Sequence, residues 1–117
     1  MSAEAIIRST LSALVGDRIY PLVAPTGTAC PYITFQQVGG SAINFFDGAL
    51  PGRRNGRYQV NVWAEGMPQA AALARQVEDA LRVAPGLQTT VLGAPVADYE
   101  EDTELFGTMQ DFSFWTD

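Results

Sequence analysis

The clearest pattern of hydrophobic and polar positions lies between residues 57 and 81, where a period of two gives way to a helical period. From Arg57 to Ala64 apolar and polar side chains alternate, which is typical of a half-buried strand. Gly66 breaks this strand, and Pro68 suits a first helical turn because no backbone N–H is needed there. Apolar residues then recur every three or four positions and predict an amphipathic helix: Ala70, Leu73, Ala74, Val77 and Leu81. Both elements must bury an apolar face, so we expect this strand and helix to form the centre of the core.

Other elements flank this unit. Ser2 suits the N-cap of a first helix, predicted from Ala3 to Leu14 and ended by Gly16. A loop with three prolines follows, and residues 32–38 are rich in β-branched and aromatic residues and predict a strand. Near the C-terminus, residues 96–101 and 105–115 predict two strands joined by a turn at residues 102–103. We therefore expect one α+β domain spanning residues 1–117, with a mainly antiparallel sheet of about four strands and two helices packed on one face.

The longest irregular segment runs from Gly39 to Gly56 between two predicted strands. Loops of this length without their own secondary structure are usually functional or disordered. Two adjacent aromatic residues in the loop are not typical of disorder, so we expect a loop that is mobile in the free protein and becomes ordered against a partner. The residues expected at this partner or subunit interface are Phe45, Phe46, Arg53, Arg54 and Arg57. The two tryptophans, Trp63 and Trp115, are expected to be core or interface aromatics, with Trp63 largely buried.

Composition excludes several classes of function. The chain has no histidine and no lysine, so it cannot build a histidine-based catalytic triad or a lysine-containing phosphate loop. No Cys/His cluster exists to hold zinc, and the single Cys30 excludes an intrachain disulfide. We therefore expect no enzymatic activity, no cofactor and no metal. There is no apolar run long enough to span a membrane and no signal-peptide pattern, which predicts a soluble protein made and kept in a cytoplasm.

Two charged clusters remain open to interpretation. Residues 98–104 contain five carboxylates, which suggest either a Ca²⁺ or Mg²⁺ site or a hydrated hairpin tip that discourages edge pairing; the absence of EF-hand spacing favours the tip. The three arginines at positions 53, 54 and 57 suggest either a contact to phosphate or an acidic partner, or a solvated loop. A net charge of −6 argues against bulk nucleic-acid binding.

Four segments together resemble the tail completion or tail terminator proteins of long-tailed phages, which also occur in prophages and gene transfer agents. They are LVGDRIYPLVAP, PYITFQQVGG, RRNGRYQVNVWAE and DYEEDTELFGTMQDFSFW, at residues 14–25, 31–40, 53–65 and 98–115. No single segment is a diagnostic motif, but their order and spacing cover nearly the whole chain.

The resemblance implies a structural virion protein assembled in the host cytoplasm. It would form a ring of six identical subunits that caps the head-proximal end of the tail tube, ends tube growth and joins the tail to the head connector or neck protein. DNA would pass through the ring without specific binding. Two alternatives from other classes are a small α+β ligand-binding domain, which needs a preformed apolar pocket, and a hydrolase that uses only carboxylates.

Overall fold

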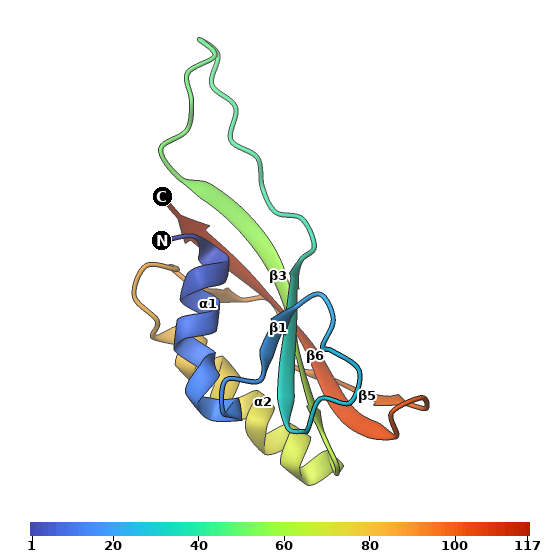
Figure 1. Ribbon diagram of the computed structural model, residues 1–117. Coiled ribbons are helices and arrows are strands. Elements are labelled where there is room, and N and C mark those ends of the chain that lie inside the picture. Colours follow the sequence, from blue (N-terminus) through green and yellow to red (C-terminus); the bar gives the residue numbers. More distant parts are fainter.

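A six-stranded sheet with two helices on one of its faces forms the body of the protein (Figure 1). The structure is a computed structural model and describes residues 1–117. The elements in chain order are helix α1 (Ala3–Leu11), the 3₁₀ helix η1 (Ser12–Val15), β1 (Ile19–Pro21), β2 (Tyr32–Gln37), β3 (Arg54–Ala64), α2 (Met67–Arg82), β4 (Thr90–Val91), β5 (Val96–Glu100) and β6 (Leu105–Thr116). No helix is long and apolar enough to cross a membrane.

The sheet is larger than the four strands expected from the sequence, and it is mainly antiparallel, as expected, with one parallel pairing. Its order is β1-β2-β3-β6-β4, with β5 also paired to β6. β1 runs parallel to β2, while every other pairing is antiparallel. The two additional strands, β1 and β4, have three and two residues. Elements this short carry no readable alternation, so the expectation of about four strands was wrong, while the α+β class and the placement of both helices on one face were correct.

Strands β3 and β6 form the spine of the sheet. They pair antiparallel without interruption from Arg54↔Thr116 to Ala64↔Phe106. On β6, β5 occupies one part of the free edge and β4 another. Residues on the helix face of this spine are buried, as the alternation predicted: Tyr58, Val60, Val62, Ala64, Phe112 and Phe114.

The helices cover this face with their predicted apolar stripes. All five stripe residues of α2 are buried, and Ile7 and Leu11 of α1 join the same core. The Ser2 hydroxyl accepts a hydrogen bond from the Ala5 N–H at 3.1 Å, which confirms the N-cap. Gly16 ends the following 3₁₀ turn in the left-handed region, at φ 55°. α2 ends at Arg82, one residue after Leu81, the last residue of its apolar stripe.

The second face of the sheet carries no helices, and both tryptophans lie on it. Residues that alternate with Trp63 on β3 and with Trp115 on β6 point toward the helices, so the two indoles point away from them. Both tryptophans are partly buried there. A Cβ atom on Gly107 would lie only 2.6 Å from Cε3 of Trp63, so the indole covers this glycine on the neighbouring strand. Trp63 is therefore largely but not fully buried, and a role for either tryptophan at an interface remains a prediction.

Candidate assembly surfaces

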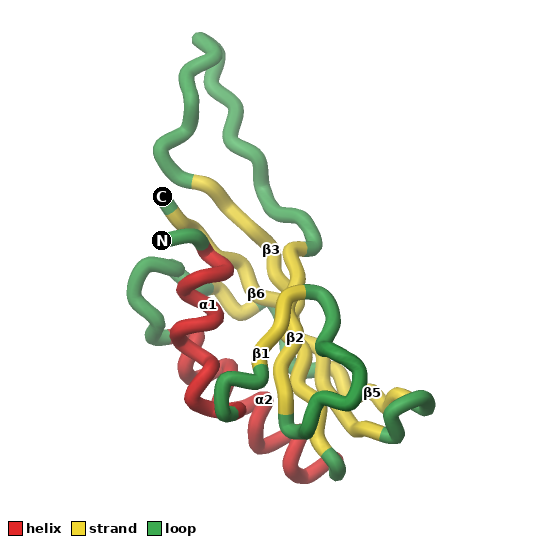
Figure 2. The backbone as a smooth tube through the Cα atoms, in the orientation of Figure 1, coloured by secondary structure: helices red, strands yellow, loops and turns green.

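A long projection between β2 and β3, residues 38–53, extends beyond the sheet; we call it the arm (Figure 1). Figure 2 shows that it contains no helix or strand. The arm lies along the long direction of a molecule that measures 52 × 25 × 24 Å. The predicted loop of residues 39–56 was therefore too long at its end, because Arg54, Asn55 and Gly56 already belong to β3 and pair with β6.

Hydrogen bonds fix the base of the arm but not its tip. At the base, the Val38 N–H donates to the Arg57 carbonyl at 2.7 Å, and the Ser41 N–H donates to Oδ1 of Asn55 at 2.8 Å. At the tip, a single backbone turn closes between the Gly48 N–H and the Phe45 carbonyl at 3.1 Å. No ladder of backbone hydrogen bonds joins the two limbs, so the chain itself leaves most of their donors and acceptors open to solvent or to a partner.

The tip of the arm is apolar and uncovered. Phe46 is fully exposed, and Leu50 and Phe45 are 85 % and 51 % exposed. Three large apolar side chains on one short projection form an exposed patch of the kind that marks an interaction surface. The structure thus places Phe45 and Phe46 where the sequence prediction needs them, accessible to a partner.

The three arginines of the predicted interface lie at the arm base but differ in their surroundings. Arg53 lies 3.4 Å from the Asp117 carboxylate and donates to the Trp115 carbonyl at 3.0 Å. Arg57 forms an ion pair with Asp111 at 2.8 Å. Arg54 is exposed and has no carboxylate partner in the chain. Arg54 is therefore the arginine of this cluster whose charge is free for a partner.

A hollow of about 870 Å³ lies at the base of the arm, between its limbs and the two chain termini. Only five of its seventeen lining residues are hydrophobic, and Arg53, Arg54 and Asp117 are among the rest. Small-molecule pockets are mostly apolar and enclose their ligand. The hollow therefore lacks the character that the ligand-binding alternative requires.

Five of the thirteen acidic residues lie on β5 and the turn after it, at the end of the molecule opposite the arm (Figure 1). All five carboxylates of residues 98–104 are exposed on β5 and the turn that follows it, and none forms an ion pair. The rest of the chain has eight acidic residues against seven arginines, so this hairpin carries nearly all of the net charge of −6. No group of three carboxylates lies close enough to hold a metal ion.

A groove of about 370 Å³ runs between α2 and β5, next to the acidic hairpin. Two charged residues, Arg75 and Glu78, line it. The other lining residues are small or flexible: Met67, Ala71, Ala74, Pro95, Ala97 and Thr108. Sequence reasoning missed this groove, because it treated the alanines of α2 only as part of a core stripe. The available signal was Ala71, which lies outside that stripe and is exposed.

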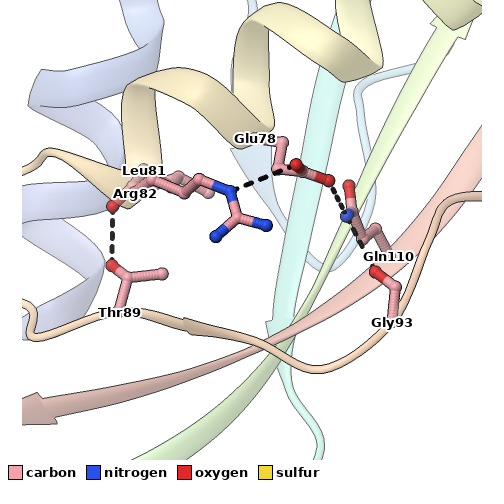
Figure 3. Close-up of polar contacts among 6 residues, drawn as sticks. All are labelled: Glu78, Leu81, Arg82, Thr89, Gly93 and Gln110. Atoms are coloured by element: carbon pink, nitrogen blue, oxygen red, sulfur yellow. Dashed lines mark hydrogen bonds and ion pairs between the residues drawn. The ribbon is translucent and has the colours of Figure 1, made fainter.

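A polar cluster holds the segment that leads into β5 (Figure 3). The buried side chain of Gln110 donates from Nε2 to the Glu78 carboxylate at 2.7 Å and to the Gly93 carbonyl at 2.9 Å. Arg82 lies 3.2 Å from the other oxygen of Glu78. These contacts, led by the hydrogen bond from Gln110, hold the pKa of Glu78 below its usual value, and partial burial opposes them. The cluster fixes Gly93, two residues before Pro95 of the groove.

The one thiol of the chain, Cys30, is half-buried in the loop before β2. Burial raises its pKa, and the nearby Glu65 carboxylate raises it further. A raised pKa leaves less of the reactive thiolate at neutral pH.

Comparison with known proteins identifies the family. The family model described as tail completion protein gp17 matches residues 6–117. No curated protein sequence matches the chain. Among solved structures, a chain from the virion of a native gene transfer agent (GTA) particle superposes with a TM-score of 0.67 at 20 % identity, over 97 % of this chain and 93 % of that one. At this identity the likeness supports the fold, while the family model covers nearly all of the sequence. The chain therefore belongs to the tail completion protein gp17 family.

Proposed function

We propose that this protein forms a closed ring, of six copies, at the head-proximal end of a phage-type tail tube. The ring ends tube growth and joins the tail to the connector or neck of the head. The protein is then a structural component of the virion, assembled in the host cytoplasm, with no catalytic role. Its partners are copies of itself, the tube protein and the connector.

The match to the tail completion family over residues 6–117 is the observation that carries this proposal. The physical need for such a protein follows from how a tube grows. Identical subunits that stack head to tail make a contact that does not close by itself. A different protein must occupy the last growing face and present another surface beyond it. A body with an apolar arm at one end and an acidic hairpin at the other offers distinct surfaces for distinct partners.

The charges of the chain suit a ring through which DNA passes without being held. Non-specific binding to DNA depends on arginine and lysine side chains that neutralise phosphates and release counterions. Here Arg53 and Arg57 already lie beside carboxylates, and the net charge is −6. Such a surface gains little from contact with the DNA backbone.

The test is to mix the purified protein with tail tubes and to follow both its oligomeric state and the growth of the tubes. We expect closed rings bound at one end of each tube, and no further elongation at that end when tube protein is added. Measurement by native mass spectrometry and electron microscopy gives the number of copies. A chain that stays monomeric beside tubes, with both tube ends still growing, would refute the proposal.

A further inference from the structure

We propose that the arm of one copy inserts Phe46 into the groove between α2 and β5 of the next copy. This inference rests on the proposed ring and identifies the contact that links its subunits. The partner is thus a second copy of this chain, bound head to tail. Two features at opposite ends of the molecule, a projecting apolar side chain and a groove lined by small residues, carry the proposal.

The arm has the reach and the chemistry of an inserting element. Phe46 lies six positions after Gly40, and an extended chain of this length spans about 20 Å. The arm base is tied to β3 by hydrogen bonds, so the direction of the arm is set although its tip is free. Phe46 has no cover within its own chain, and Phe45 and Leu50 beside it add further exposed apolar surface.

The groove has the size and the lining to receive a phenyl ring. An apolar cavity of about 150 Å³ is enough to hold benzene, and the groove measures about 370 Å³. Ala71, Ala74 and Ala97 leave space that larger side chains would fill, and Met67 can adapt its shape to an inserted ring. The remaining room suits a second apolar side chain from the arm.

Charge favours this head-to-tail pairing over a symmetric one. A contact between two acidic ends would bring five carboxylates of one copy against five of another. Like charges on the outer strand also disfavour pairing between two β5 edges. The arm instead carries Asp47 next to Phe46, and the groove is lined by Arg75, which has no ion-pair partner in its own chain. A protrusion at one end that fits a pocket at the other makes a heterologous contact, which closes into a ring when the rotation allows.

Two single variants and their mixture test the contact. Phe46→Ser removes the inserting side chain and leaves the groove intact. Ala71→Trp fills the groove and leaves the arm intact; because Ala71 is exposed, the core is not disturbed. Ala72→Trp, on the exposed side of the same helix and outside the groove, is the matched control. A urea melt of each variant confirms that it is folded.

We expect each of the two variants alone to associate at least tenfold more weakly than wild type and to form no ring. Their equimolar mixture should give a one-to-one dimer, because one intact arm meets one intact groove. The Ala72→Trp control should form the wild-type ring. In a Cys30→Ser background, Asp47→Cys chains, which keep Phe46, should form a mixed disulfide with Ala97→Cys chains but not with Ala72→Cys chains.

The outcomes separate this inference from the proposed function. Wild-type rings from both Phe46→Ser and Ala71→Trp would overturn the arm–groove contact and leave the ring proposal in place. A wild-type protein that forms no ring, alone or on tubes, would overturn both. Absence of the one-to-one dimer, with both variants folded and monomeric, would show that the interface is not built from this arm and this groove.

Discussion

Replacing Glu78 by alanine should destabilise the fold, because this carboxylate satisfies a buried amide. Gln110 is 4 % exposed, and its Nε2 donates to Glu78 and to the Gly93 carbonyl (Figure 3). Without Glu78 one N–H of a buried side chain has no partner in the protein. A buried donor left unsatisfied costs about 1–3 kcal/mol.

The loss of stability expected for Glu78→Ala can be divided between the two partners of Glu78, Gln110 and Arg82. The bond from Gln110 is short, at 2.7 Å, and involves a charged acceptor, so we expect about 2 kcal/mol from its loss. The pair with Arg82 spans one helical turn and is solvent-exposed on the arginine side, so it contributes only about 0.3–0.5 kcal/mol. Glu78→Gln keeps an acceptor for Gln110 but loses the charge, and we expect it to cost about 1 kcal/mol.

The pH dependence gives a second, independent readout of the same contact. The pKa of Glu78 is lowered in the folded protein, so its stabilising effect is complete above the unfolded pKa of about 4.3. The effect is lost as the pH falls through the lower, folded pKa. The difference in unfolding free energy between wild type and Glu78→Gln should therefore shrink as the pH falls from the unfolded pKa through the folded pKa of Glu78, because the wild-type side chain becomes neutral as well.

Urea melts between pH 7 and pH 3 measure both effects, with Asp79→Ala as the control. Asp79 lies next to Glu78 on α2, is exposed and has no hydrogen-bond or ion-pair partner. Its replacement should change the free energy of unfolding by less than about 0.5 kcal/mol. Equal losses for Glu78→Ala and Asp79→Ala, or a difference between wild type and Glu78→Gln that grows at low pH, would refute the reasoning.

Two predictions concern the sheet face that carries no helices and the arm. Gly107→Ala should cost about 1–3 kcal/mol in a thermal or urea melt, because the new Cβ would lie 2.6 Å from both the Trp63 ring and the Val62 carbonyl oxygen; a loss under 0.5 kcal/mol would show that the indole moves aside freely. Amide hydrogen exchange should be fast at residues 42–47 in free subunits, where the backbone N–H groups have no hydrogen-bond partner in the chain, and slower in the assembled particle. Equal rates in both states would argue against the arm as an assembly element.

Much of the fold could be predicted because its determinants are local. The change from alternation to helical periodicity around Gly66 identified β3 and α2, and the alternation in β6 placed Phe112 and Phe114 on the buried face. The same alternation places Trp63 on the sheet face opposite Val62, away from the helices.

The two strands that were not predicted, β1 and β4, form because of the strands that they pair with rather than because of their own residues. β1 has three residues and becomes a strand only through its parallel pairing with β2. β4 has two residues and lies on the edge of β6. Elements this short depend on tertiary pairing, which one-dimensional patterns do not contain.

The candidate site could be predicted in part for the same reason. Phe45 and Phe46 in a glycine-rich loop indicated an exposed apolar element, and the structure exposes both. The sequence could not distinguish Arg54 from Arg53 and Arg57, whose carboxylate partners are Asp117 and Asp111 far along the chain. It also could not reveal a groove assembled from α2 and β5, which meet only in the folded protein.

Electron micrographs of particles produced without this protein test the central claim most directly. If the chain caps the tail tube and joins it to the head, deletion of its gene should leave filled heads and separate tails, with tube lengths spread over a wide range. Supplying the protein from a second copy of the gene should restore joined particles. Joined particles with tails of uniform length in the deletion strain would contradict the account.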